Sequence, residues 1–201
     1  MASIKLTNSF YQRPDVVHIS KVLLGKVLCT QFPGQPLTSG IITETEAYCG
    51  HNDKASHAHN GLRTDRTKVM YHPGGVSYVY LCYGIHHLFN VVTNVHDNAD
   101  AVLIRAVEPL DGIDTILDRR NAETLSASVA AGPGRLTKAL SIKTAHTGSD
   151  LTGNTIWIED RDINFNQEQI ASSPRIGVDY AGDDARLPWR FYVKENEWVS
   201  K

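Results

Sequence analysis

Three β-rich segments follow one another in the middle of the chain with only short connections between them: residues 76–83, 87–93 and 101–107. The first begins directly after Pro73-Gly74-Gly75, a strong turn signal, and Tyr83-Gly84-Ile85-His86 has the composition of a hairpin tip between the first two. Strands joined by tight turns pair antiparallel, and helices do not alternate with strands here as βαβ units require. We therefore expect an α+β fold in which residues 1–201 form a single domain, with a curved, mainly antiparallel β-sheet flanked by helices and a protruding β-hairpin.

Other segments add strands and helices before and after this unit. Strands are expected at 26–31, 41–48, 155–159 and 190–194, and helices at 16–25, 111–121, 122–130 and 135–140. In the second of these strands, the period of two places Ile42, Glu44, Glu46 and Tyr48 on one face. Two acids beside Ile and Tyr do not make a simple core face, so one of them is expected to line a cleft. Residues 49–70 show little periodicity, which is typical of a functional loop with short helical turns.

Composition limits the class of protein. A chain of 201 residues, of which 41% are hydrophobic and 21% charged, is typical of one globular domain. It has no run of 18 apolar residues, so no membrane span is expected, and its first residues lack the basic start and apolar run of a signal peptide. Cys29, Cys49 and Cys82 are odd in number and form no CxxC pair, which indicates reduced thiols. We expect a protein of the cytoplasm, or of the nucleus if the chain is eukaryotic.

The net charge of −2 gives no global reason to expect a polyanionic partner, but the charges are distributed unevenly. Residues 54–96 contain one acid, Asp65, and four Lys or Arg residues, and residues 135–149 contain no acid. A local positive potential can steer DNA even to a near-neutral protein. The alternative interpretation is uneven charge on a solvated surface, and composition does not separate the two.

Acids, aromatic rings and a histidine lie close together within one part of the chain. Glu46, next to an aromatic residue on a strand face, could deprotonate a water in a partly dry pocket, and Glu44 fits the same pattern. Tyr48, His57 and Tyr80 could form the walls of a slot for a flat, electron-poor ring. Each has a structural alternative, because an acid in a strand is often an exposed cross-strand partner and a strand tyrosine often packs in the core.

Three further features have both a functional and a structural interpretation. Tyr83 at a hairpin tip is expected to be exposed, where an aromatic side chain can wedge into a duplex, unless the tip folds back on the sheet. Arg105 lies in an apolar run and needs a partner such as Glu46, since an unpaired buried charge is costly. Gly132-Pro133-Gly134-Arg135 at a helix start suits an anion such as a backbone phosphate, or caps the helix. The chain has no HExxH motif and no helical zinc pair of histidines, so no metal and no cofactor are expected.

Taken together, these motifs resemble the alkyladenine DNA glycosylase family, also called methylpurine or 3-methyladenine DNA glycosylases. The matching segments keep their order and approximate spacing over about residues 4–200, nearly the whole chain. They are Glu44-Thr45-Glu46-Ala47-Tyr48, Asp53-Lys54-Ala55-Ser56-His57, Tyr78-Val79-Tyr80-Leu81-Cys82-Tyr83-Gly84, Asn90-Val91-Val92, residues 102–110, Gly132-Pro133-Gly134-Arg135-Leu136, Pro174-Arg175-Ile176-Gly177 and Arg190-Phe191-Tyr192-Val193. Each segment alone is weakly specific, but the ordered set is highly specific.

The resemblance implies a DNA repair enzyme of base excision repair. Such a monofunctional DNA glycosylase flips alkylated or deaminated purines out of double-stranded DNA and hydrolyses the N-glycosidic bond, leaving an abasic site without AP-lyase activity. It implies Glu46 as the general base that activates the water, which selects it over Glu44. Arg105 and the main-chain carbonyl of Ile176 would help Glu46 to hold that water. No cofactor is implied, the partner is duplex DNA with damaged purines, and we expect a monomer.

The resemblance also implies how the base is held. Tyr48 and His57 would stack on one side of the flipped purine and Tyr80 on the other. Asn90 would lie at the floor of the pocket, where it disfavours normal guanine, and Tyr83 would insert into the duplex. The residues expected to contact the DNA backbone are Arg135, Lys138 and Arg175.

Alternatives stay open at the level of the residues. A non-catalytic nucleic-acid-binding module could use the same basic, aromatic face, and a metal-dependent hydrolase is a lesser alternative. His59 lies two residues after His57 and could take over its stacking role. The motifs do not rank 3-methyladenine, 7-methylguanine, hypoxanthine and ethenoadenine as substrates.

Overall fold

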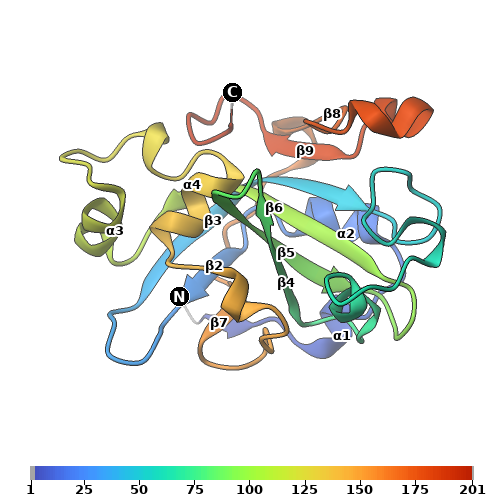
Figure 1. Ribbon diagram of the computed structural model, residues 1–201. Coiled ribbons are helices and arrows are strands. Elements are labelled where there is room, and N and C mark those ends of the chain that lie inside the picture. Colours follow the sequence, from blue (N-terminus) through green and yellow to red (C-terminus); the bar gives the residue numbers. More distant parts are fainter. Residues whose placement is uncertain (1–2, 201) are drawn as a thin grey trace.

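A nine-stranded sheet forms the centre of the computed structural model, which describes residues 3–200 (Figure 1). The strands are β1 (Ile4–Lys5), β2 (Val27–Thr30), β3 (Thr38–Tyr48), β4 (Ser77–Cys82), β5 (His86–Thr93), β6 (Asp100–Pro109), β7 (Ile156–Asp160), β8 (Ile170–Ser173) and β9 (Arg190–Val193). Their order is β1-β7-β2-β3-β6-β5-β4, and β9 pairs with both β3 and β8 beside this path. The strand pairs of the described residues are all antiparallel. The prediction of an α+β fold with a curved antiparallel sheet is confirmed.

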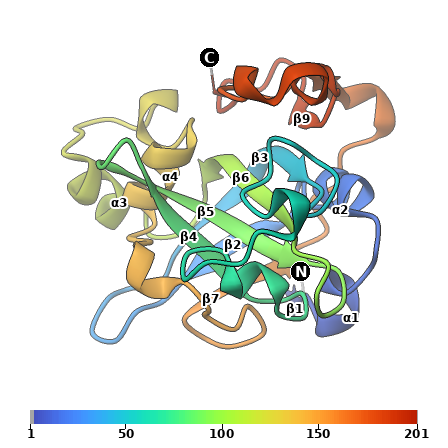
Figure 2. The same cartoon turned by 45° about the vertical axis from the view of Figure 1, so that its right-hand side comes forward.

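Short helices cover the sheet on two sides. The α-helices within the described residues are α1 (Asn8–Tyr11), α2 (Val16–Val22), α3 (Ile113–Arg120) and α4 (Pro133–Ala139). In both Figure 1 and Figure 2, α1 and α2 lie at one side of the molecule and α3 and α4 at the other. Short 3-10 segments, η1 to η6, lie at His59–Gly61, Lys68–Tyr71, Ala127–Val129, Thr144–His146, Gln167–Gln169 and Asp179–Arg186. None of the helices in residues 3–200 has the length and apolar character needed to cross a membrane.

Helix α2 forms because its start is capped and one of its faces is apolar. The carboxylate of Asp15 accepts a hydrogen bond from the N–H of His18 at 2.8 Å, a cap that is typically worth about 1 kcal/mol. Ile19 and Leu23 lie one turn apart and are fully buried. Through this face α2 packs against β3, the strand that carries both candidate acids.

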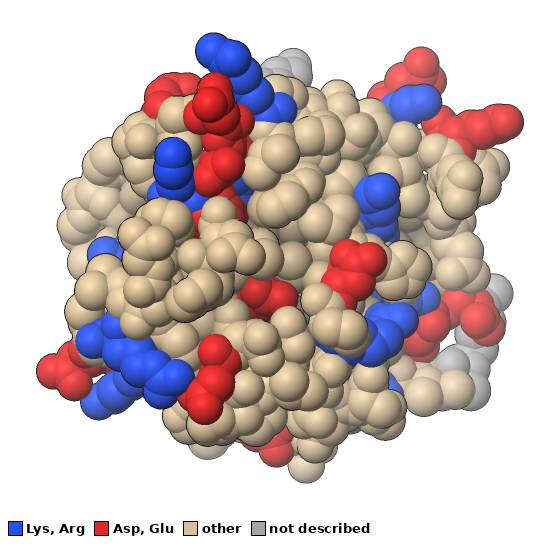
Figure 3. Space-filling view, turned by 90° about the vertical axis from the view of Figure 1, so that its right-hand side faces the viewer, with Lys and Arg blue, Asp and Glu red and all other residues tan. Residues whose placement is uncertain are grey.

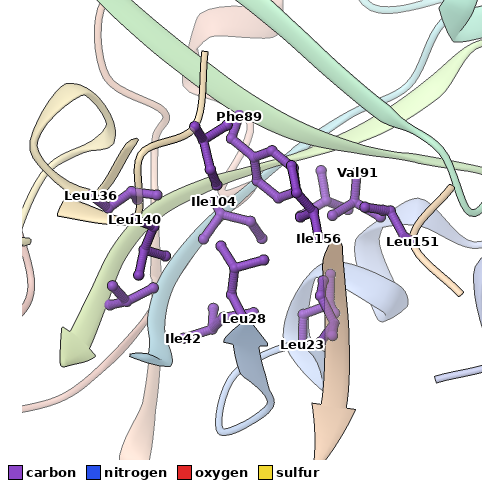
Figure 4. Close-up of a cluster of buried hydrophobic side chains, with 14 of the residues drawn as sticks. Leu23, Leu28, Ile42, Phe89, Val91, Ile104, Leu136, Leu140, Leu151 and Ile156 are labelled. Atoms are coloured by element: carbon purple, nitrogen blue, oxygen red, sulfur yellow. The ribbon is translucent and has the colours of Figure 1, made fainter. Parts of the chain in front are cut away.

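The hydrophobic core lies between the helices and the sheet (Figure 4). Leu28 of β2 and Ile42 of β3 meet Ile104 of β6 there, together with Leu136 of α4 and Leu140, the residue directly after that helix. Leu136 and Leu140 are both fully buried, and their spacing of four residues stacks them on one face. Burying a leucine side chain is worth about 1.5–3 kcal/mol, so this pair fixes α4 and the glycine-containing turn before it against the sheet.

One face of β3 differs from the prediction, because its pairing with β6 shifts register on both sides of Glu44. Ile42 and Ala47 both belong to the hydrophobic core, so they lie on the same face of the sheet. Glu46 is the neighbour of Ala47 in the strand and therefore points to the opposite face. The expectation that Ile42 shares a face with the two acids is therefore wrong. An extra residue in one strand of a pair reverses the alternation beyond it. The second shift, between Glu44 and Thr45, leaves Arg105 of β6 without a directly opposite residue on β3, and its guanidinium contacts both Glu44 and Glu46.

The helix expected at 122–130 does not form, so this prediction is wrong. Asn121 ends α3 in the left-handed region, with φ 51° and ψ 50°, and Ser126 is extended. Beyond it, Ala127–Val129 makes a single 3-10 turn. The Oγ atoms of Ser126 and Ser128 lie 2.9 Å apart. Serine side chains that find local hydrogen bonds outside a helix compete with helix formation, which the hydrophobic pattern alone does not reveal.

Three residues, 83–85, connect β4 to β5, because Cys82 pairs with His86. Tyr83 has φ 51° and Gly84 has φ 73°, and the N–H of Ile85 donates to the carbonyl of Cys82 at 3.2 Å. Positive φ at both central residues is the type I′ geometry that matches the twist of paired strands. Tyr83 is 88% exposed, so the tip stands free of the sheet as predicted.

Candidate active site

A cavity of about 680 Å³ lies against β3, β4, β5 and β6, within the usual range for a ligand pocket. Residues from the loop after β3, from the start of α4 and from segments 176–180 and 197–200 complete its wall. Most of the residues predicted for the site line this cavity: Tyr48, His57, Tyr80, Tyr83, Asn90, Arg105, Arg135 and Ile176. Residues that are far apart in the sequence are thus brought to one place by the sheet.

The carboxylate of Glu46 lies directly behind this wall and is fully buried. Its Oε2 accepts a hydrogen bond from the Tyr48 hydroxyl at 2.7 Å. Its Oε1 accepts from the N–H of Ile176 at 2.8 Å and lies 3.3 Å from Nη1 of Arg105. Burial raises the pKa of Tyr48, and the adjacent carboxylate raises it further, so this hydroxyl stays protonated and donates. The contact from Ile176 is made by its N–H group, whereas the resemblance pointed to its carbonyl.

Arg105 joins two buried carboxylates. Its Nε donates to Oε1 of Glu44 at 2.8 Å, while its Nη1 faces Glu46. Burial alone disfavours the charge of Arg105, but Glu46 and Glu44 raise the pKa of its guanidinium above the ordinary value. Burial likewise disfavours the ionised form of Glu44, but Arg105, Ser200 and Arg190 hold the pKa of Glu44 below its ordinary value. The expected contact with Glu46 is present, and the contact with Glu44 was not expected.

The aromatic wall is not a slot with two facing sides. The rings of His57 and Tyr80 meet edge to face, with centroids 4.7 Å apart and an angle of 79° between their planes. Tyr78, which the sequence did not single out, lies 5.5 Å from Tyr80. A ring stacked between two others needs about 7 Å between them, so no purine fits between His57 and Tyr80 in this conformation. The three rings instead line the cavity together.

His57 is held by two side chains that the sequence did not predict as partners. Its Nδ1 lies 2.9 Å from the Tyr78 hydroxyl, and its Nε2 accepts from Nη2 of Arg66 at 3.1 Å. Burial, and then the charge of Arg66, lower the pKa of His57 to about 4, so the ring is neutral near pH 7. Arg66 lies in the aperiodic segment 49–70, where no strand or helix face indicates the direction of a side chain.

The structure distinguishes between the two neighbouring histidines and places the predicted asparagine. His57 lines the cavity, whereas Nδ1 of His59 is buried and has no hydrogen-bond partner among the described residues. Asn90 is buried in the wall of the cavity, and its Nδ2 donates to the carbonyl of Tyr78 at 3.1 Å. This bond fixes the orientation of the amide and leaves Oδ1 as its acceptor.

The cations expected to contact the DNA backbone divide into two groups. Arg135 and Lys138 are exposed on α4. The side chain of Arg175 is fully buried, with Nη2 donating to Asp53 at 2.8 Å and Nη1 donating to the carbonyl of Ala47 at 2.9 Å. The prediction for Arg175 is wrong, because a buried guanidinium engaged with a buried carboxylate does not reach a phosphate. Its contacts instead tie the loop after β3 to that strand.

The basic residues of segment 54–68 do not form a continuous positive surface. On the face shown in Figure 3, Lys and Arg are interspersed with Asp and Glu. Arg63 pairs with Asp97, and Lys68 pairs with Asp65 at 3.1 Å. Asp65 and Asp97 thus offset part of the positive charge that was expected from the composition of residues 54–96.

The chain is similar to known proteins along nearly its whole length. The family model of methylpurine-DNA glycosylase (MPG) matches residues 9–197. A protein of Alkaliphilus oremlandii, whose name refers to a 3-methyladenine DNA glycosylase, is 42% identical over 98% of this chain and 100% of its own length. Relatives from Chlamydia felis and Bacillus cereus carry the same name. Both are 44% identical, over 94% and 96% of this chain and 95% and 97% of their own lengths. The chain belongs to the methylpurine-DNA glycosylase family.

Proposed function

We propose that this protein flips alkylated or deaminated purines out of duplex DNA and hydrolyses the N-glycosidic bond with a water activated by Glu46. The observation that carries the proposal is the buried Glu46 carboxylate, held by Tyr48, Arg105 and Ile176 at the edge of a ring-lined cavity. Each of these partners also lines the cavity. A base and a water in the cavity would therefore be separated from the Glu46 carboxylate by no more than one layer of side chains.

The two oxygens of Glu46 have different capacities for a water. Oε1 accepts from Ile176 and faces Arg105, whereas Oε2 accepts from Tyr48. A carboxylate oxygen has two lone pairs, so Oε2 keeps one for the water. The water oxygen bonds to C1′ of the deoxyribose and gives its proton to Glu46, while the electron pair of the C1′–N bond leaves with the purine. The carboxylate also stabilises the positive charge that develops on the sugar.

The cavity wall suits a positively charged purine. Tyr78, Tyr80 and a neutral His57 present π-systems to the cavity, and aromatic faces attract cations. N-alkylated purines such as 3-methyladenine and 7-methylguanine carry this charge and are good leaving groups. A damaged pair is also cheaper to open than a normal pair, which favours its extrusion into the cavity.

Two surface features are placed to hold the duplex. Tyr83 stands exposed at the tip of the β4–β5 hairpin and also lines the mouth of the cavity, where its ring would fill the space that the flipped base leaves. Arg135 and Lys138 on α4 carry exposed positive charge on the same side of the molecule as this tip. We assign them contacts with the DNA backbone.

The test is single-turnover release of 7-methylguanine from a duplex that contains one such base. For Glu46→Gln, we expect release to fall by about 10²–10⁴-fold, the range for a lost general base, while affinity for the damaged duplex is kept. The matched control is Glu123→Gln, at an exposed acid, which should release the base at the wild-type rate. Near-normal release by Glu46→Gln would remove Glu46 as the base.

The same assay separates two further outcomes. Binding of damaged duplex by the wild type without any base release would indicate a nucleic-acid-binding module in place of an enzyme. For a monofunctional enzyme, the product strand stays intact until alkali cleaves it at the abasic site, because no lysine is assigned as a nucleophile. We also propose that the protein acts as a monomer. Sedimentation of the protein with and without DNA checks this proposal.

A further inference from the structure

The segment Glu197–Ser200 reaches the candidate site from a distant part of the sequence. Trp198 packs in the hydrophobic core, and its carbonyl accepts from the Thr43 hydroxyl at 3.2 Å. Val199 and Ser200, which follow, line the cavity. The packing of Trp198 therefore fixes these two residues at the cavity wall, beside the register shift of β3.

Ser200 bonds to Glu44, a buried acid that the proposed mechanism does not use. Its N–H donates to Oε2 of Glu44 at 2.7 Å, and its Oγ donates to Oε1 at 2.9 Å. Arg190 of β9 joins the group, with Nε donating to Oε1 of Glu44 at 2.6 Å and Nη2 donating to the Ser200 carbonyl at 3.1 Å. One buried carboxylate thus gathers donors from β6, β9 and the segment 197–200.

The same network holds the guanidinium of Arg105 on one side. Its Nε donates to Glu44 at 2.8 Å, and its Nη2 lies 3.4 Å from Oγ of Ser200. Its third nitrogen, Nη1, faces Glu46. A guanidinium is planar and rigid, so contacts that fix Nε and Nη2 also fix the direction of Nη1. The position of Arg105 against Glu46 therefore depends on Glu44 and Ser200, which bond to Arg105 on the side away from Glu46.

We propose that Glu44 and Ser200 are positioning residues for base release: together they orient Arg105, and through it Glu46 and the attacking water. The segment 197–200 then completes the active site, because Ser200 supplies two hydrogen bonds to Glu44, one from its N–H and one from its hydroxyl. This inference rests on the proposed function, since it assigns a role within that reaction. A shift of about 1 Å in a catalytic group can slow a reaction by about a hundredfold, so the contacts of Ser200 have a measurable consequence.

The experiment compares single-turnover rate constants on duplex DNA with one 7-methylguanine. Ser200→Ala removes one hydroxyl and keeps the main-chain bond to Glu44, and we expect its rate constant to fall about tenfold. Ser200→Thr keeps a hydroxyl and should recover most of the loss. Glu44→Gln should lose about a hundredfold. The matched control is Ser172→Ala, at an exposed serine of β8, which should behave as wild type.

The readouts separate positioning from folding. A misfolded fraction lowers the amplitude of base release but leaves the rate constant of the folded fraction unchanged, and it also lowers the melting temperature. A positioning role lowers the rate constant while amplitude and affinity for the damaged duplex stay at wild-type values. Should Glu44→Gln fail to fold, the Ser200→Ala and Ser200→Thr pair still decides the question.

Two results would overturn the inference while leaving the proposed function intact. One is a wild-type rate constant for Ser200→Ala, including the case in which only its amplitude or melting temperature falls. The other is a failure of Ser200→Thr to recover activity, which would show that the hydroxyl is not the group that matters. Absence of base release by the wild type itself would remove the proposed function, and the inference with it.

Discussion

His57 has its lowered pKa because it is buried and because Nη2 of Arg66 lies 3.1 Å from its Nε2. The groups that face it are Arg66, Tyr78 and Tyr80. The ordinary pKa of 6.5 falls to about 4 in the folded protein, so between these values the unfolded chain binds more protons. Stability that depends on the neutral ring is therefore present above about pH 6.5 and is lost as the pH falls toward 4. We predict that Arg66→Gln raises the pKa of His57 and so narrows the pH range between the folded and unfolded pKa values over which stability is lost.

NMR titration of the His57 ring measures the prediction directly. The control is Arg63→Gln, because Arg63 lies on the same loop but pairs with Asp97, and it should leave the titration of His57 unchanged. A wild-type His57 that titrates near its ordinary pKa, or an Arg66→Gln variant with the wild-type titration, would contradict the assignment of Arg66. In the proposed reaction, a protonated His57 ring would repel a cationic purine. As the pH is lowered, base release by Arg66→Gln should therefore begin to fall at a higher pH than base release by the wild type.

Some partners of the site could be inferred from the sequence and others could not. The charge of Arg105 in an apolar run requires a partner, because an unpaired buried charge is costly, and a carboxylate such as Glu46 was predicted for it. Its second partner, Glu44, follows from the register shift in β3, which no local pattern reveals. Ser200 lies 156 residues from Glu44 in the sequence, and contacts at such a distance depend on the completed fold. The burial of Arg175 against Asp53 has the same origin.

At the scale of the element, the tip of the β4–β5 hairpin holds an exposed tyrosine in a conformation that tyrosine disfavours. Tyr83 has φ 51°, where Asn and Gly are common and other residues are strained by about 1–2 kcal/mol. We predict that Tyr83→Asn leaves the melting temperature unchanged or raises it, because it relieves this strain and loses little burial. The same variant should bind lesion-containing duplex less tightly, with a smaller effect on short single strands, because no wedge enters the stack.

Thermal unfolding and fluorescence anisotropy on matched oligonucleotides check the two halves of this prediction. Tyr83→Phe keeps the ring and is the control for the loss of the hydroxyl, and its affinity for duplex should be that of the wild type. Equal losses of affinity for duplex and for single strands would contradict the wedge. A fall in melting temperature for Tyr83→Asn would show that the tyrosine contributes to folding.

Elements with strong turn signals were located well, and those with weak local signals were not. Pro73-Gly74-Gly75 and Tyr83-Gly84 fix the bounds of β4 and the start of β5, because glycine and proline restrict the backbone locally. In contrast, the segment 122–130 has an apolar pattern compatible with a helix, but the left-handed Asn121 and the serines after it end the helical path. The two-residue β1 and the short β8 exist only as partners of β7 and β9, so they carry no signal of their own.

At the scale of the whole molecule, the antiparallel sheet explains why the site lies where it does. β3 and β6 pair in the middle of the sheet order, and β9 adds a third strand beside β3. The buried charges of Glu44, Glu46 and Arg105 and the half-buried charge of Arg190 come from these three strands, so they lie where the backbone has paired neighbours on both sides. The exposed Arg135 and Tyr83 come from elements at the rim. The rigid part of the fold thus carries the proposed chemistry, and the rim carries the proposed DNA contacts.

The distribution of surface charge leads to a last prediction, on the salt dependence of DNA binding. The net charge is −2, and Asp and Glu residues are interspersed with Lys and Arg on the face of Figure 3. We therefore expect few phosphate contacts and a shallow slope when the logarithm of the DNA-binding constant is plotted against the logarithm of the salt concentration. Each contact contributes about 0.9 to that slope. Arg135→Gln and Lys138→Gln should each lower it by about one, measured by anisotropy between about 50 and 200 mM salt. Lys21→Gln, at an exposed lysine of α2 on the opposite side from α4 (Figure 1), should leave the slope unchanged. An Arg135→Gln slope equal to that of the wild type would place the backbone of the DNA elsewhere on the molecule.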